Sequence, residues 1–140
     1  MAEQVLIDGL CFGEGPRWHD DALWLSDMHD RRVLKVQPDG SAETVITLED
    51  DEPSGLGWLP DGELLIVSMR KRQLLRFDGQ HLQLHADLRE LASWYCNDMV
   101  VDGAGRAYVG NFGFDLHQGA EPRPAELIRV NPDGSVVVED

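Results

Sequence analysis

The chain has 140 residues, and its 26 acidic side chains outnumber its 12 basic ones, which gives a formal net charge of −14. This charge excludes nucleic acid and anionic membranes as partners, because both would repel the protein. The length suits one domain with a hydrophobic core, no apolar run approaches the ~18 residues that a membrane span needs, and no secretory signal is visible at the N-terminus.

The first informative segment, residues 11–18, reads Cys-Phe-Gly-Glu-Gly-Pro-Arg-Trp. It places Glu14 between two glycines just ahead of a strand-like stretch. A carboxylate in such a turn is exposed at a strand end, where it is free to bind a ligand, and a hard cation such as Ca²⁺ prefers oxygen ligands of this kind. The plain alternative is a loop carboxylate with no role.

The sequence then repeats itself. Residues 22–36 align without gaps on residues 63–77, 41 positions later, and a third copy begins at Arg106 and resumes at Glu126. Residues 112–125 form an insertion inside this third copy, rich in Gly, Pro and acidic residues, and we expect the longest excursion of the chain there. Five Asp-Gly pairs mark strand reversals: Asp39-Gly40, Asp61-Gly62, Asp78-Gly79, Asp102-Gly103 and Asp133-Gly134.

A period of ~40 to 45 residues with about four strands per unit is typical of a β-propeller blade. The sequence therefore predicts an all-β fold of three four-stranded blades, over residues 14–53, 54–96 and 97–140. The alternative is a β-sandwich with evenly spaced hairpins, and residues 88–95 alone resemble a helical turn. Because three blades do not close a ring, we expect half of a six-bladed propeller, either part of a longer protein or completed by a second copy across exposed faces of the first and third blades.

Other reactive side chains show no recognisable spacing. The acids of residues 49–52 are interpreted as a solvated loop, and the five scattered histidines do not suggest a zinc site. Cys11 and Cys96 are too few for a disulfide framework, which fits a reduced, cytoplasmic setting. Both are interpreted as small buried packing residues, with a thiol nucleophile as the alternative. The tryptophans divide by position: Trp94 could line a pocket wall, whereas three others are expected in the core, namely Trp18, Trp24 and Trp58.

Four motifs occur in an order that carries a family resemblance: Gly-Glu-Gly-Pro-Arg-Trp at 13–18, Pro-Ser-Gly-Leu-Gly at 53–57, Asn-Asp-Met-Val-Val-Asp at 97–102 and Gly-Arg-Ala-Tyr-Val-Gly at 105–110. The chain resembles the N-terminal half of the senescence marker protein/gluconolactonase/luciferin-regenerating enzyme family, which includes regucalcin. The resemblance implies a six-bladed propeller that holds a divalent metal in its central channel and hydrolyses lactones.

The resemblance also implies roles for single residues. Glu14 corresponds to the metal-binding carboxylate of the first blade, and Asn97 to an Asn that contacts metal or substrate. Asp115 falls where some relatives have an acid that touches substrate. Tyr95 stands in a substrate-binding position where sugar-lactone enzymes often have an Arg, which argues against a polyhydroxylated sugar-acid substrate. The metal is expected to be Ca²⁺, with Zn²⁺, Mg²⁺ or Mn²⁺ as alternatives. No catalytic residue is assigned, since the family's catalytic Asp lies beyond residue 140.

These observations favour a metal-dependent hydrolase of a lactone or ester, or the N-terminal half of one. The resemblance implies that the metal polarises the lactone carbonyl while a carboxylate activates water. Two alternatives stay open: a non-catalytic module that binds calcium or a small ligand, and a structural half-propeller that dimerises. Whether the chain alone is an enzyme is undecided, because it lacks the expected catalytic Asp.

Overall fold

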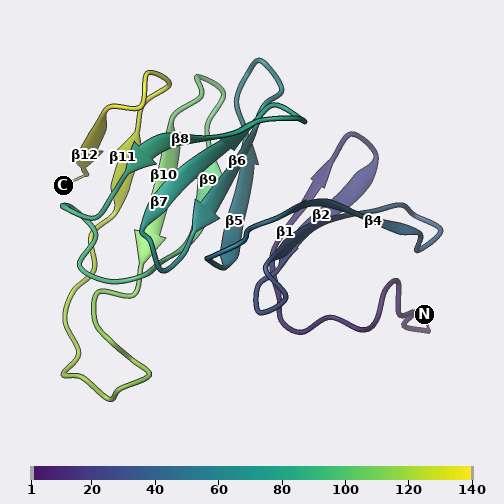
Figure 1. Cartoon of the computed structure of the whole chain (residues 1–140), viewed down its shortest axis with the longest axis horizontal. Coiled ribbons are helices and arrows are strands. Elements are labelled where there is room, and N and C mark those ends of the chain that lie inside the picture. Colours follow the sequence, from purple (N-terminus) through teal and green to yellow (C-terminus); the bar gives the residue numbers. More distant parts are fainter. Residues whose placement is uncertain (1, 140) are drawn as a thin grey trace.

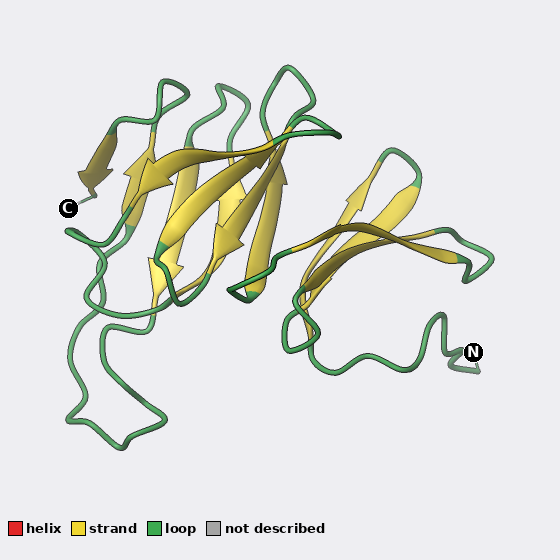
Figure 2. Ribbon diagram, in the orientation of Figure 1, coloured by secondary structure: helices red, strands yellow, loops and turns green. Residues whose placement is uncertain are grey.

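The computed structural model describes residues 2–139 and, over that range, all regular secondary structure is β (Figures 1 and 2). Twelve strands form three antiparallel four-stranded sheets, with orders β1-β2-β3-β4, β5-β6-β7-β8 and β12-β11-β10-β9. The strands are β1 (Gly13–His19), β2 (Ala22–Asp27), β3 (Arg32–Val36), β4 (Ala42–Thr47), β5 (Pro53–Trp58), β6 (Leu64–Ser68), β7 (Gln73–Phe77), β8 (Leu82–Asp87), β9 (Cys96–Val101), β10 (Ala107–Asn111), β11 (Ile128–Val130) and β12 (Val136–Val138).

The fold prediction is confirmed: the chain forms three four-stranded blades of an open half-propeller. The sequence repeat is also a backbone repeat. Arg31 and Arg72, 41 positions apart, both adopt positive φ, at 58° and 52°. Their carbonyls accept the amides of Leu48 and Leu88 at 2.7 and 2.9 Å. Such a conformation costs energy in a residue with a side chain, so its recurrence marks the same tight reversal in both sheets.

Apolar side chains join consecutive sheets into two continuous cores. Between the first and second sheets lie Val33, Leu56, Leu64 and Ile66, with Trp24 and Trp58 packed against them. The larger core joins the second and third sheets and contains Leu59, Leu65, Val67, Leu74, Ala86, Leu88, Ala92, Cys96, Met99, Ala107, Val109, Ile128 and Val130. Residues 88–92 form a hydrogen-bonded turn rather than a helix. The described part of the chain contains no helix that is long and apolar enough to cross a membrane.

The first sheet is not open on its free side. Ile7 and Leu10, from the extended segment that precedes β1, pack against a small core of Leu25, Leu34 and Val36. The expectation that the first blade exposes its apolar face is therefore wrong in part, because the chain's own N-terminal segment covers it. The same segment presents Val5 and Leu6 to solvent, at 77% and 37% exposure.

The inner strands β1, β5 and β9 approach one another closely, and glycines make this possible. A Cβ added to Gly55 would lie 2.6 Å from the amide nitrogen of Met99, and one added to Gly15 would lie 2.8 Å from the carbonyl oxygen of Ser54. Real Cβ atoms do not occupy such positions. The Gly-Glu-Gly-Pro and Pro-Ser-Gly motifs therefore bring the beginnings of the inner strands to one place.

Two expectations about single residues are corrected by the structure. Trp18 is 64% exposed and is not a core residue, whereas Trp24 and Trp58 are half-buried at the first seam. Cys96 is buried as expected, but Cys11 is exposed. Trp18 points outward because it lies on the opposite face of β1 from Arg17, which pairs with Asp98, and His19, which stacks on Trp58.

Candidate functional site

A cavity of about 500 Å³ opens where the three inner strands begin. This volume lies within the usual range of small-molecule sites. Its walls come from all three sheets and from the loop between β10 and β11. The lining residues are Phe12, Glu14, Met28, His29, Glu52, Ser54, Met69, Arg70, Tyr95, Asn97, Asp98, Phe112 and His117.

The cavity is built from one backbone element used three times. In each sheet the residue that follows the second strand donates its amide to the carbonyl of the residue just ahead of the first strand. The three bonds are Met28 to Phe12 at 2.8 Å, Met69 to Glu52 at 3.0 Å, and Phe112 to Tyr95 at 3.0 Å. All six of these residues line the cavity. The sheets therefore present equivalent positions around its mouth.

Two residues beyond each accepting carbonyl stand Glu14, Ser54 and Asn97, which also line the cavity. Side chains two apart in an extended chain point the same way, so these three form a second, polar layer, displaced from the mouth by about 6–7 Å along the strands. Glu14 and Asn97 are half-buried. Within residues 2–139, neither of their side chains is hydrogen-bonded to the protein.

The other two carboxylates of the lining are already paired. Glu52 accepts Arg70 at 3.0 Å and lies 3.5 Å from the His29 ring. Asp98 accepts Arg17 at 2.5 Å. Among the described lining residues, Glu14 thus contributes the carboxylate without a cationic partner. Together with the amide oxygen of Asn97 it forms the hard oxygen set that a divalent cation such as Ca²⁺ prefers, so the donor chemistry fits.

Tyr95 forms part of the cavity wall and is held from two sides. Its ring stacks on Trp94, with centroids 4.7 Å apart and planes inclined by 18°, and its carbonyl accepts the amide of Phe112. Trp94 itself is not among the lining residues. It supports the wall from behind.

Asp115, the fourth expected site residue, is not among the residues that line the cavity. It belongs to the loop between β10 and β11, the long excursion at the lower left of Figure 1, and its carboxylate accepts the amide of Gln118 at 3.2 Å. The same loop contributes Phe112 and His117 to the cavity. The structure therefore brings Glu14, Tyr95 and Asn97 together, and it leaves Asp115 in a turn of its own loop.

The acidic run at residues 49–52 is only partly the solvated loop expected from the sequence. Asp51 is 3% exposed and accepts the amides of Glu52, Arg70 and Lys71 at 2.8, 3.1 and 2.9 Å, and the hydroxyl of Ser68 at 2.5 Å. It ties the start of β5 to the reversal after β6, whereas its neighbour Glu52 reaches the cavity. The signal that could have revealed Glu52 is its position directly ahead of Pro-Ser-Gly, equivalent to Phe12 ahead of Gly-Glu-Gly.

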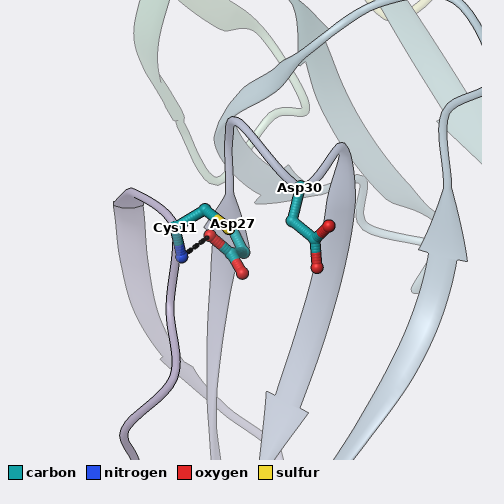
Figure 3. Close-up of side chains that lie close together, drawn as sticks. All are labelled: Cys11, Asp27 and Asp30. Atoms are coloured by element: carbon teal, nitrogen blue, oxygen red, sulfur yellow. Dashed lines mark hydrogen bonds between the residues drawn. The ribbon is translucent and has the colours of Figure 1, made fainter.

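A second group of potential metal ligands, Cys11, Asp27 and Asp30, lies beside the first sheet (Figure 3). Its centre is already occupied by protein donors. One oxygen of the fully buried Asp27 accepts the amides of Cys11 and Phe12, both at 2.8 Å, and the other accepts Arg32 at 3.0 Å. Arg32 also pairs with Asp30 at 2.8 Å. The group is a structural latch that fixes the backbone leading to Glu14.

The ionisation of Asp27 agrees with this role. Burial alone would raise the pKa of its carboxyl, but the hydrogen bonds from Phe12, Arg32 and Cys11 outweigh burial and hold the pKa below its ordinary value. For Cys96, beside Asn97, burial raises the pKa of the thiol to about 12. A thiol that stays protonated is a poor nucleophile, so the packing interpretation of Cys96 holds.

Comparison with known proteins identifies a family model, described as the SMP-30/Gluconolactonase/LRE-like region, that matches residues 12–140. Pentonolactonase XacC of Haloferax volcanii is 29% identical over 139 residues, covering 97% of this chain and 45% of that protein. A gluconolactonase structure from Xanthomonas campestris has a TM-score of 0.76 and 25% identity, over 96% of this chain and 49% of that one.

A solved calcium-binding protein, regucalcin from Agrobacterium tumefaciens, shares the fold with a TM-score of 0.71 and 22% identity, over 92% of this chain and 43% of that one. The chain thus spans about half the length of the relatives it matches.

Proposed function

Since the chain belongs to the SMP-30/gluconolactonase/LRE-like family, we propose that it supplies half of the active site of a metal-dependent lactone hydrolase. One observation carries the proposal: Glu14 and Asn97, from equivalent positions on the first and third inner strands, line one cavity, and neither side chain has a hydrogen-bond partner among residues 2–139. The pentonolactonase and gluconolactonase among the relatives support a lactone as the substrate class.

In this proposal Glu14 and Asn97 would hold the cation. Ca²⁺ is the preferred ion, with Zn²⁺, Mg²⁺ or Mn²⁺ as alternatives. The calcium-binding regucalcin among the structural neighbours supports that order. A bound divalent cation would polarise the lactone carbonyl. The chain's own residues orient the substrate, with Tyr95 as one wall of its site and Asp115 as a contact that the long loop would have to deliver. Two protein oxygens are fewer than the six to eight that Ca²⁺ takes, so water and residues outside this chain complete the shell.

Calorimetry tests the metal site directly. The purified chain should bind Ca²⁺ weakly, and Glu14→Gln should weaken binding by at least about tenfold, because the neutral amide loses the charge that attracts the cation. Glu43→Gln, an exposed carboxylate of β4, serves as the matched control and should bind like the wild type. Equal heats for Glu14→Gln and the wild type would reject Glu14 as a ligand.

We also propose that a second copy can complete the ring. Val100, Tyr108, Arg129 and Val137 are consecutive cross-strand partners on the free face of the third sheet. Leu65, the counterpart of Tyr108 in the second sheet, is fully buried against the third sheet. The free face is thus the kind of surface that another sheet covers.

A two-fold axis through the channel would bring this face of one copy against the N-terminal segment of the other, whose Val5 and Leu6 are exposed. Each ring would then contain Glu14 and Asn97 twice. Light scattering on the purified chain provides the test, because a stable monomer of 15.7 kDa at all concentrations would reject this assembly.

A further inference from the structure

The two layers of the cavity differ in chemistry. The deeper layer carries the polar side chains of Glu14, Ser54 and Asn97. The mouth layer consists of the six residues joined by the three repeated hydrogen bonds, and five of them are aromatic or thioether side chains, namely Phe12, Met28, Met69, Tyr95 and Phe112. The sixth, Glu52, is neutralised by Arg70. Each of the three sheets therefore contributes at least one apolar side chain to the cavity, beside the polar side chains of His29, Arg70, Asp98 and His117.

We infer from this arrangement that the site prefers lactones with an apolar substituent over polyhydroxylated lactones. The inference rests on the proposed function, since it assumes that the reacting ring lies at the polar layer. A substituent on that ring then extends past the mouth layer, about 6–7 Å further along the strands. Burying an alkyl chain of that length against aromatic and thioether side chains is favourable, because it removes apolar surface from water. Burying hydroxyl groups against the same side chains is unfavourable, because they lose their hydrogen bonds to water and gain none from those side chains.

Tyr95 is the specificity-determining residue of this wall. Its ring stacks on Trp94 in a nearly parallel arrangement, which restricts the orientation of the ring. A side chain that is already ordered loses little conformational freedom when a ligand packs against it, so more of the contact energy appears as affinity. The ring of Phe12, by contrast, is 45% exposed and contacts the ring of His29 edge-on, with the two ring centroids 5.1 Å apart.

Two lactams test the inference without any hydrolysis, because an amide ring resists the reaction. The probes are the δ-lactam analogue of δ-decalactone, which carries a pentyl chain, and glucono-δ-lactam. Binding to the purified chain is followed by amide chemical shifts in NMR titrations. The alkyl lactam should bind at least about tenfold more tightly than the sugar lactam.

Variants assign the selectivity to Tyr95. Tyr95→Phe keeps the ring and should keep the affinity ratio, whereas Tyr95→Ser should lower the affinity for the alkyl lactam several-fold more than the affinity for the sugar lactam. Trp18→Ser, which removes an exposed aromatic ring of β1 that does not line the cavity, is the control and should leave both affinities as they are. Near-ultraviolet circular dichroism establishes that each variant is folded.

Three outcomes would overturn the inference: equal or tighter binding of the sugar lactam, an unaltered ratio in Tyr95→Ser, or no binding of either lactam. The proposed function fails separately. If Ca²⁺ does not bind but the alkyl lactam does, the metal-dependent mechanism is rejected and the apolar preference stands. If Ca²⁺ binds through Glu14 but the sugar lactam is preferred, the mechanism survives and the preference is rejected.

Discussion

Gly55 lies where the inner strands β5 and β9 approach closely, and the site requires that it carry no side chain. Its position faces the amide nitrogen of Met99 and the Cα of Asp98, at 2.6 and 2.9 Å from a hypothetical Cβ. Both neighbours are backbone atoms, which cannot rotate away as a side chain would. Any larger residue would push β9 away from β5, and with it the cavity wall that includes Asn97.

We predict that Gly55→Ala destabilises the fold by about 1–3 kcal/mol, the usual cost of overpacking a tight contact. Gly103→Ala is the matched control, because a Cβ there meets no atom within 4 Å and its φ is not in the left-handed region. Thermal unfolding followed by circular dichroism compares the two. A melting temperature for Gly55→Ala equal to that of Gly103→Ala would show that the inner strands are not closely packed.

The latch at Asp27 should make stability depend on pH in acid. Its folded pKa lies below the ordinary value, so the stabilisation is present above the unfolded pKa of ~3.9 and is lost as pH falls through the folded pKa. We expect Asp27→Asn to be less stable than the wild type at pH 7, with a difference that shrinks steadily below about pH 4. Urea unfolding at several pH values measures this, and a difference that stays constant down to pH 2 would contradict the role of the charge.

The sequence identified part of the candidate site and missed another part for a physical reason. Glu14 and Asn97 could be proposed as site residues because each belongs to a short motif at the start of a strand. Glu52 was harder to recognise, because four acids in a row resemble a solvated loop and only the position ahead of Pro-Ser-Gly distinguishes Glu52 from its neighbours. Once the register is known, Glu52 is the counterpart of Phe12 and Tyr95 at the mouth. Asp51 was missed likewise, since four donors that satisfy it come from residues up to 20 positions away.

At the scale of elements, the 41-residue repeat and the Asp-Gly turns were enough to predict three blades, because a hairpin is a local structure. The turn residues and the alternation of apolar and polar residues in the two strands determine where a hairpin forms, and both lie within a few residues. The covering of the first sheet by the N-terminal segment could not be predicted in the same way. Ile7 and Leu10 lie in a stretch without a repeating pattern, and their partners in β2 and β3 are distant in sequence.

The free face of the third sheet leads to a prediction about assembly. Val100 is 62% exposed on β9, the inner edge strand of that sheet, so Val100→Lys should convert a dimer to a monomer by burying an unpaired charge. Leu84→Lys is the matched control, since Leu84 is 56% exposed on β8, away from this face. Light scattering of both variants gives the masses, and a Val100→Lys protein that remains dimeric would exclude this face from the interface.

At the scale of the whole molecule, the proposed function makes the cavity one half of an active site. In that proposal Glu14 and Asn97 would hold the cation, and a further base would have to activate water. Glu14 cannot fill both roles, and the other two lining carboxylates are paired with Arg70 and Arg17. We therefore predict that the purified chain hydrolyses δ-lactones no faster than buffer in a pH-stat assay, with or without Ca²⁺. Turnover that depends on Ca²⁺ and disappears in Glu14→Gln would show that the chain already contains a complete catalytic set.

The consecutive order of strands within each sheet also bears on how the chain acquires its structure. Every strand pairs with neighbours that are next to it in sequence, so each sheet closes short loops and has low contact order for a β protein. During synthesis the first sheet can pair before the second has been made, and its own N-terminal segment shields one side meanwhile. The surface most prone to aggregation is then the apolar face of the newest sheet, which the following sheet has not yet covered. As synthesis continues, each new sheet covers the face of the one before it and exposes its own.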